Sequence, residues 1–207
     1  MKLFSKKETI SIIVIFLVLV AISMPNFIVS LRRARDQVRR DDMGRLQSAL
    51  ADYEADFGTF PMSTSDGRII ACKAPNAKVQ IDKNGRINID LIPCEWGRDS
   101  FTDLTPGSKK VYMGTLPSDP QENQGVKYLY SSDGIRYQIL SSMEGTDEPE
   151  YDKTIVAREV MCGSRVCNMG RAFGCPINMS IEDYKIYLEK QRELQDAQKA
   201  KNAQIKK

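Results

Sequence analysis

The chain has 207 residues, of which 28% are charged and 42% are hydrophobic, and its formal net charge is +3. So small a charge, carried by basic residues spread along the chain, gives no basis for nucleic acid as a partner. The sequence contains no histidine, which excludes Ser-His and Cys-His nucleophile pairs and histidine metal sites. We therefore expect a protein that is not an enzyme. The alternative is a hydrolase that is tethered to a membrane and uses carboxylates, and it would need a deep acidic cleft.

Residues 10–31 are the most informative segment. They are apolar except for three serines and one asparagine, and they carry no charge over 22 residues. At about 1.5 Å per residue, a helix of this length crosses the hydrocarbon core of a bilayer. The run is too long for a cleaved signal peptide and lacks a small-residue cleavage site. We expect a transmembrane helix preceded by a short basic leader at residues 1–9.

Helical patterning continues without a break over residues 32–57. The apolar residues are mostly three, four or seven positions apart and so share one face of a helix. They are Leu31, Val38, Leu46, Leu50, Tyr53 and Phe57. Gly58 and Pro61 then mark the end of the helix. We expect an amphipathic continuation of the transmembrane helix that buries the stripe from Leu46 to Phe57 against the rest of the protein.

Residues 58–178 are expected to form the head of the protein. Apolar and polar residues alternate on both sides of Asn84-Gly85, and residues 127–131 and 136–140 flank Ser132-Asp133-Gly134 in the same way. Each pattern predicts a β-hairpin, and residues 111–113 add another candidate strand. A three- or four-stranded antiparallel sheet laid on the amphipathic helix gives an α+β fold.

The chain contains five cysteines. In an oxidising compartment they predict two disulfides and one free thiol. We prefer the pair Cys72–Cys94, because both residues fall in the segment of sequence between the expected helix and the expected sheet. The second pair stays open among Cys162, Cys167 and Cys175. A zinc site is the weaker alternative, since the chain has no Cys-x-x-Cys spacing and no histidine.

Three sequence elements occur together in a characteristic order. Glu8 is followed 17 residues later by Pro25-Asn26-Phe27. The expected helix ends in Tyr53-Glu-Ala-Asp-Phe-Gly-Thr-Phe-Pro61, and Leu116-Pro-Ser-Asp-Pro120 precedes the second hairpin. This combination resembles the type IV pilins and the pseudopilins of type II secretion, over residues 8–61 and 115–152. The resemblance implies a pilin-like fold, with a long N-terminal helix packed on a small antiparallel sheet.

The resemblance also implies roles in assembly for Glu8 and Pro25. Glu8 would meet the N-terminal amine of a neighbouring subunit, and Pro25 would permit local unwinding when helices pack into a filament. The alternatives are an interfacial Glu8 neutralised by Lys6 or Lys7 and a tolerated kink at Pro25.

Processing by a prepilin peptidase would remove Met1 to Leu3 and be followed by methylation of Phe4. Here Leu3 stands where the family has glycine, and Ser5-Lys6-Lys7 separates Phe4 from Glu8. The leader therefore departs from the family pattern.

Basic residues lie on both sides of the apolar run. Three lysines precede it, and five arginines follow within residues 32–40. Since more of them follow the run than precede it, a count of Lys and Arg alone would place the C-terminal side of the run in the cytoplasm. The cysteines and the resemblance favour a cytoplasmic N-terminus with the head outside, and we adopt that orientation. The arginines would hold the helix at the membrane interface or pair with acids of neighbouring subunits; no aromatic platform for nucleic acid accompanies them.

Residues 144–152 carry five carboxylates, including Asp147 and Asp152. Calcium binds six to eight oxygens, which a flexible acidic loop can supply. The major pseudopilins bind calcium in the loop after the hairpin, so the resemblance points to calcium as well. Asp147 and Asp152 are the first ligands we expect; the alternative is a solvated acidic loop.

Residues 179–207 predict a C-terminal helix or a charged tail. Ser180 and Asp183 are spaced as in a capping box, and Ile181, Tyr184 and Leu188 give a short apolar stripe. The helix would bind a partner or pack on the head; alternatively, it would fray into solvent.

The pattern as a whole favours a structural subunit of a type IV pilus or a type II secretion-like pseudopilus. Its partners would be the membrane, other copies of itself or other pilins, and the assembly machinery. The alternative is a permanently anchored, pilin-like ectodomain with a binding or scaffolding role, which the two lysines of the leader favour.

Overall fold

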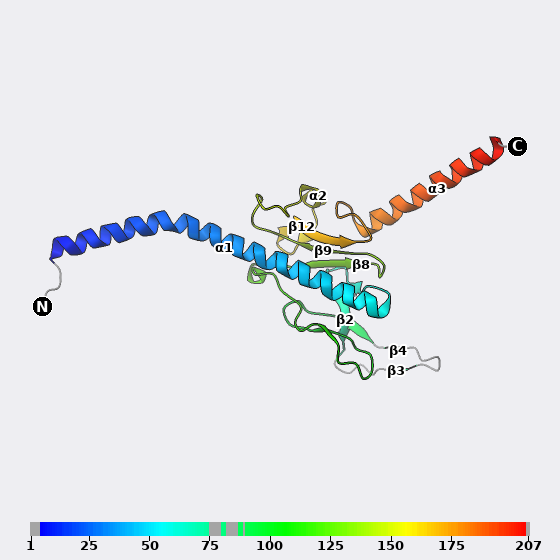
Figure 1. Ribbon diagram of the computed structural model, residues 1–207, viewed down its shortest axis with the longest axis horizontal. Coiled ribbons are helices and arrows are strands. Elements are labelled where there is room, and N and C mark those ends of the chain that lie inside the picture. The colour runs from blue at the N-terminus through cyan, green and yellow to red at the C-terminus, as the bar shows by residue number, and fades with distance from the viewer. Residues whose placement is uncertain (1–4, 75–79, 82–86, 89, 206–207) are drawn as a thin grey trace.

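The computed structural model describes residues 5–74, 80–81, 87–88 and 90–205. Its dominant element is helix α1, Lys6–Phe57, which is 52 residues long. The front half of α1 extends free of the other elements, and its rear half lies across a small β-rich head (Figure 1). The structure confirms an α+β fold in which a long N-terminal helix packs on small antiparallel sheets.

Both ends of α1 have defined caps. Ser5 and Glu8 form a capping box, in which the Ser5 amide donates to Glu8 Oε2 at 2.8 Å and the Glu8 amide donates to Ser5 Oγ at 3.3 Å. Gly58 ends the helix with φ of 72°, and its amide donates to the Glu54 carbonyl at 2.7 Å. A side chain at Gly58 would disfavour this left-handed conformation. Between these two caps the helix runs without a break from the apolar segment into the head.

The central sheet of the head has three antiparallel strands in the order β12-β9-β8. They are β8, Leu129–Ser132; β9, Tyr137–Ser141; and β12, Met169–Phe173. The hairpin predicted around Asp133-Gly134 is confirmed, with Leu129 opposite Leu140 and Ser132 opposite Tyr137. Strand β12 was not predicted; it pairs with β9 from Met169–Ser141 to Phe173–Tyr137.

The remaining strands form small antiparallel sheets around the central one. A three-stranded sheet has the order β1-β2-β5, with β1 at Met62–Ser63, β2 at Ile69–Lys73 and β5 at Leu91–Pro93. The described residues also form three two-stranded pairs: β3 Gln80–Ile81 with β4 Ile87–Asn88, β6 Phe101–Thr102 with β7 Val111–Met113, and β10 Met161–Cys162 with β11 Arg165–Val166.

Two of these pairs bear on predicted strands. The first predicted hairpin is confirmed where it is described, because Ile81 pairs with Ile87; its Asn84-Gly85 turn lies outside the described residues. The strand expected at residues 111–113 is β7, which pairs with β6 and not with the central sheet.

The core lies between the rear half of α1 and the sheets. Met43, Leu46 and Leu50 are each 1% exposed and belong to the same cluster of buried side chains as Tyr130 and Ile139. Tyr53 stacks on Phe101 with ring centroids 5.3 Å apart. Burial of this apolar face is the main favourable free-energy change that holds the helix on the head.

The expected burial of the stripe from Leu46 to Phe57 is wrong at its last residue, because Phe57 is 39% exposed. Leu31 and Val38, which the pattern placed on the same face, are 43% and 45% exposed. On the membrane-proximal turns, the side chains that face the head are instead polar, with Asp36, Arg39 and Asp42 buried. These charges are buried because acidic side chains, a tyrosine hydroxyl and backbone amides of the head meet them there.

Two disulfides link parts of the head. Cys72 bonds to Cys94, the pair preferred from the sequence, and Cys162 bonds to Cys167. Cys175 is the free cysteine. Cys94 is fully buried and follows β5 directly, so the first bond holds the loop after β5 against the β1-β2-β5 sheet.

Three further helical segments follow the long helix in the described part of the chain. They are the 3₁₀ turn η1, Glu122–Gln124; the short helix α2, Lys153–Val156; and α3, Ile181–Ile205. The amide of Asp183 donates to Ser180 Oγ at 3.0 Å, as in the predicted cap. Beyond its first turns α3 projects away from the head (Figure 1), with Ile186, Tyr187 and Leu194 exposed.

The two disulfides are expected to differ in their effect on stability. Cys72–Cys94 closes a separation of 22 residues, so the C72A/C94A substitution should lower the free energy of unfolding by about 3 kcal/mol. Cys162–Cys167 closes a separation of 5 residues, and C162A/C167A should cost about 2 kcal/mol. Urea unfolding followed by tryptophan fluorescence measures both values. The opposite ranking would contradict this assignment.

Candidate functional site: the long helix, its junction with the head, and a pocket

The front half of α1 presents only exposed side chains. None of the most apolar 18-residue window of α1 is buried inside the protein. Ser11, Ser23 and Ser30 each donate a hydroxyl hydrogen bond to the carbonyl one turn earlier, at 3.1, 2.7 and 2.9 Å. These bonds satisfy the serine hydroxyls within the helix itself, as an apolar environment requires. The segment is suited to apolar surroundings on every side.

Of the residues expected to act in processing and assembly, the structure describes Glu8 and Pro25. Leu3 and Phe4 are outside the described residues. Glu8 is bound locally through the capping box with Ser5, and in the described part of the chain it forms no ion pair with Lys6 or Lys7. Pro25 lies inside α1, where it leaves the carbonyl of Ala21 without its usual helical donor.

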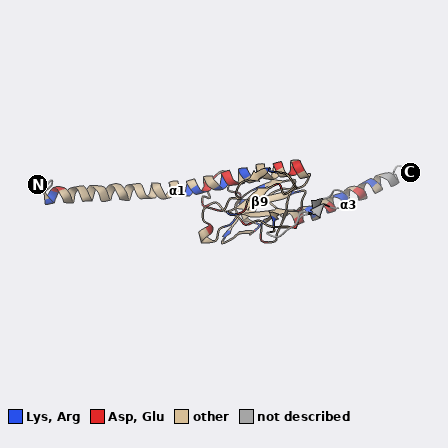
Figure 2. Cartoon of the chain, turned by 90° about the horizontal axis from the view of Figure 1, so that it is seen from below, with Lys and Arg blue, Asp and Glu red and all other residues tan. Residues whose placement is uncertain are grey.

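The arginines of α1 bind the acidic loop of the same chain. Arg35 Nη2 donates to Glu144 Oε2 at 2.7 Å, and Arg40 Nη1 lies 3.0 Å from Glu148 Oε2. The guanidinium of Arg32 contacts Asp147 Oδ1 at 2.8 Å. Figure 2 shows blue and red residues alternating where α1 meets the head, after a front half with almost no charge. In this structure these arginines therefore pair with acids of their own chain. Pairing with acids of neighbouring subunits stays a prediction.

Arg39 is the centre of this junction. Its side chain is fully buried, and it donates to Asp119 through Nε at 2.7 Å and through Nη2 at 2.9 Å. Nη1 donates to Asp36 Oδ1 at 2.7 Å and to Glu144 Oε1 at 3.2 Å, and Nη2 reaches Gln121 Oε1 at 3.0 Å. Burial opposes the charge of Arg39, but these acidic partners outweigh it and raise its pKa.

The carboxylate of Asp36 completes the junction. Its two oxygens accept from the amides of Glu144 and Gly145, each at 2.9 Å. Six residues further along α1, Tyr128 Oη donates to Asp42 Oδ2 at 2.7 Å, and burial raises the pKa of Asp42. Charged and hydrogen-bonding groups of α1 thus hold three separate parts of the head.

The calcium ligands expected from the sequence are used in other ways. Asp147 pairs with Arg32, and Asp152 caps α2 by accepting from the Thr154 amide at 2.7 Å. Within the described ranges, no group of three acidic, cysteine or histidine side chains is arranged to hold a metal ion. Calcium at Asp147 and Asp152 stays a prediction; in this structure arginines of α1 balance most of the charge of the acidic loop.

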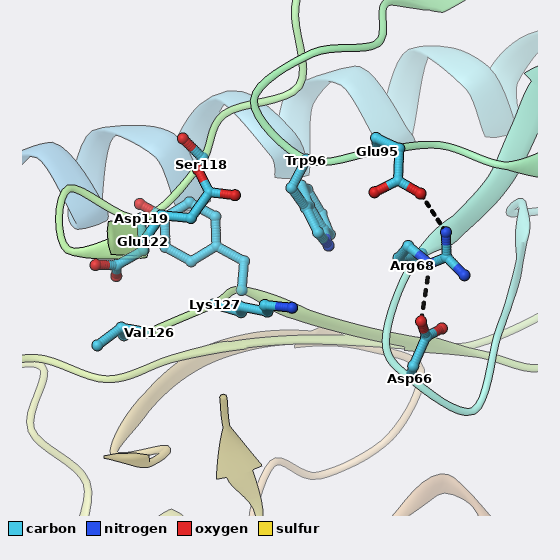
Figure 3. A pocket seen from close by; sticks show the side chains of 10 residues that line it. Asp66, Arg68, Glu95, Trp96, Ser118, Asp119, Glu122, Val126 and Lys127 are labelled. Atoms are coloured by element: carbon cyan, nitrogen blue, oxygen red, sulfur yellow. Dashed lines mark hydrogen bonds and ion pairs between the residues drawn. The ribbon is translucent and has the colours of Figure 1, made fainter. Parts of the chain in front are cut away.

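A pocket of about 340 Å³ opens on the head beside this junction. Four separate segments build it: the β1–β2 turn, the loop after β5, the turn around η1 and the residues before β8. Figure 3 shows Trp96 between Glu122 on one side and the paired Arg68 and Glu95 on the other, with Lys127 across from it. Sequence reasoning missed this pocket. The single tryptophan of the chain, two residues after Cys94, was the one available signal.

Comparisons of the chain with protein-family models, with curated proteins and with solved structures found no match. Among the described residues, α1 is the one helix long and apolar enough to cross a membrane, a property that it shares with signal sequences. What the chain does must therefore follow from its own residues and their geometry.

Arg39 is expected to be the most costly single residue to neutralise at the junction. R39M leaves Asp36 and Asp119 buried without their counter-charge, which should lower the free energy of unfolding by about 3–5 kcal/mol. Arg33 is the matched control, because its side chain is 63% exposed and lies 4.0 Å from Glu148. R33M should change stability by less than about 0.5 kcal/mol. Equal effects of the two substitutions in urea unfolding would refute a central role for Arg39.

The junction also predicts how stability depends on pH. Hydrogen bonds from Arg35 and Arg39 hold the pKa of Glu144 below its ordinary value, against the opposing effect of burial. A carboxyl group with a lowered folded-state pKa stabilises the fold above its unfolded-state pKa of about 4.3 and loses that contribution as pH falls. The difference in urea midpoint between the wild type and E144Q should therefore be widest near pH 7 and shrink below about pH 4.

Comparison with E144Q removes the contributions of other titrating groups, including Asp42, whose pKa shifts in the opposite direction. A difference in midpoint that stays constant from about pH 7 to about pH 3 would contradict the assigned role of Glu144.

Proposed function

We propose that the chain is a pilin-like structural subunit, anchored by the front half of α1 and assembled into a type IV pilus or a pseudopilus through that helix. The observation that carries this proposal is the division of α1. Residues 10–31 are apolar, exposed on every side and free of the head, whereas the rear half of the same helix is bound to the head. Such a rod with a head at one end can pass from a bilayer into a bundle of like helices.

The resemblance to pilins and pseudopilins supports the same function. Glu8 and Pro25 keep the family spacing, and both lie on the continuous helix α1. In a bundle of apolar helices a carboxylate has a strong need for a cationic partner, which the N-terminal amine of a neighbouring subunit would supply. In this proposal the head lies outside the membrane, where the two disulfides are stable.

The rigid link between helix and head suits a subunit that bears load. The ion cluster around Arg39 and the apolar contacts of Leu46 and Leu50 bind one face of α1 at two levels. Force applied along a bundle of such helices would pass to the heads without a flexible linker.

A permanently anchored ectodomain is the second candidate. The observation that favours it is the leader, in which Lys6 and Lys7 follow the capping residue Ser5 and begin α1. In this case α1 remains in the bilayer, and the head acts in binding or scaffolding. The two candidates differ in whether the chain ever leaves the membrane.

Substitution of Glu8 distinguishes the two candidates. In cells that make the protein naturally, E8Q should reduce the amount of the chain in sheared surface filaments at least about tenfold. The reason is that breaking one ion pair in an apolar bundle costs more free energy than the roughly 1.4 kcal/mol that corresponds to a tenfold change. The amount in the membrane should not change. E193Q, an exposed glutamate of α3, is the control and should assemble normally. Immunoblots of the sheared and the membrane fractions measure the amount of each variant in filaments and in the membrane. The proposal would be rejected if E8Q formed filaments at the wild-type level, or if the wild type formed no filaments.

A further inference from the structure

The pocket around Trp96 has a preorganised aromatic wall. The Trp96 ring meets the Tyr128 ring edge to face, at 6.1 Å between centroids and 88° between planes. Trp96 Nε1 donates to the Gly67 carbonyl at 3.3 Å, which fixes the orientation of the indole. Two perpendicular aromatic rings thus form a corner of the pocket before any ligand arrives.

The backbone that carries Trp96 is held from several sides. Cys94 is bonded to Cys72, the Glu95 amide donates to Asp99 Oδ2 at 2.7 Å, and the Gly97 amide donates to the Leu116 carbonyl at 2.8 Å. Because the wall is already ordered, a ligand would lose little binding free energy to ordering it.

Polar groups around the corner are available to a ligand. The side chains of Ser118, Glu122 and Lys127 form no hydrogen bond or ion pair within the part of the chain that the structure describes, and Glu122 and Lys127 are exposed. They offer a hydroxyl, a carboxylate and an ammonium group, so the site can both donate and accept. The opposite wall holds Arg68, which pairs with Asp66 at 2.9 Å and with Glu95.

The charges of the lining exclude several classes of ligand. Asp66 and Glu95 are paired with Arg68, and Asp119 is paired with Arg39, so Glu122 and Lys127 are the charges that remain for a ligand. Each disfavours a ligand of its own sign: Glu122 disfavours an anion, and Lys127 disfavours a cation. A purely apolar ligand would leave these charged groups without solvent or partners. A neutral ligand with one apolar face and a rim of hydroxyls satisfies all three constraints.

We propose that this pocket binds a neutral saccharide, with the apolar face of a sugar ring against Trp96 and its hydroxyls bonded to Glu122, Lys127 and Ser118. A volume of about 340 Å³ lies at the small end of ligand pockets, which suits a mono- or disaccharide unit at the end of a larger glycan. This activity would belong to the head and does not depend on how α1 assembles.

The pocket is also connected to the buried junction of α1. Asp119 and Tyr128 line the pocket, and the same two residues bind Arg39 and Asp42 of the helix. These contacts exist only in the folded chain, so a saccharide that binds the pocket binds the folded state. Binding should therefore raise the urea midpoint of the whole chain.

Trp96 makes a direct test of binding simple, because it is the only tryptophan in the chain. The full chain is placed in lipid nanodiscs, since detergents with sugar head groups would compete. It is then titrated with lactose, maltose, cellobiose and N,N′-diacetylchitobiose while tryptophan emission is followed. We expect a saturable change with at least one of these disaccharides at millimolar concentrations or below.

The double substitution E122A/K127A removes two exposed polar groups of the pocket and should weaken that binding at least about tenfold. E189A/K190A removes the same two residue types from exposed positions of α3 and should leave it unchanged. The proposal is overturned if no disaccharide gives a saturable change, or if E122A/K127A binds as tightly as the wild type. A saturable response to tetramethylammonium chloride, with none to the sugars, would assign the pocket to cations and overturn it too.

Discussion

The buried guanidinium of Arg39 holds together parts of the chain that are far apart in sequence. It donates to Asp119, 80 residues away, and to Glu144, 105 residues away, while Asp36 on the same helix completes its contacts. Removing such a charge from water costs several kcal/mol, which only well-placed acidic partners repay. The geometry is therefore demanding: the helix, the turn before η1 and the acidic loop must meet in one arrangement for any of them to be stable there.

This arrangement explains how a single helix can serve two environments. From Ile10 to Leu31 its side chains are exposed and almost wholly apolar. In the turns that follow, four arginines pair with acids of the head, and they are Arg32, Arg35, Arg39 and Arg40. The acidic loop balances arginines that would otherwise stand uncompensated beside the apolar segment. Leu46 and Leu50 then add apolar burial further along the same face. The head is bound both by ions and by apolar contact, so it follows the helix as one body.

Local features could be predicted from the sequence. The length of the helix follows from an unbroken pattern and the glycine at its end, the β8–β9 hairpin from its turn residues, and the Cys72–Cys94 bond from position alone. Long-range features could not. Arg39 lies on the same helix face as Leu46, seven positions earlier, but its charge is typical of a solvent-facing residue, and its burial depends on partners 80 and more positions away. The acidic loop has the composition of a calcium site, yet arginines balance it. The pocket draws on four segments, none of which carries a motif of its own.

The mass of the intact protein tests whether the chain is processed and assembled as the pilin-like subunit that we propose. The protein would be purified from its native membrane and measured by mass spectrometry without proteolysis. If the proposal holds, we expect loss of Met1 to Leu3 and one methyl group on Phe4. A full-length chain with an unmodified N-terminus would contradict it and would favour a permanently anchored ectodomain.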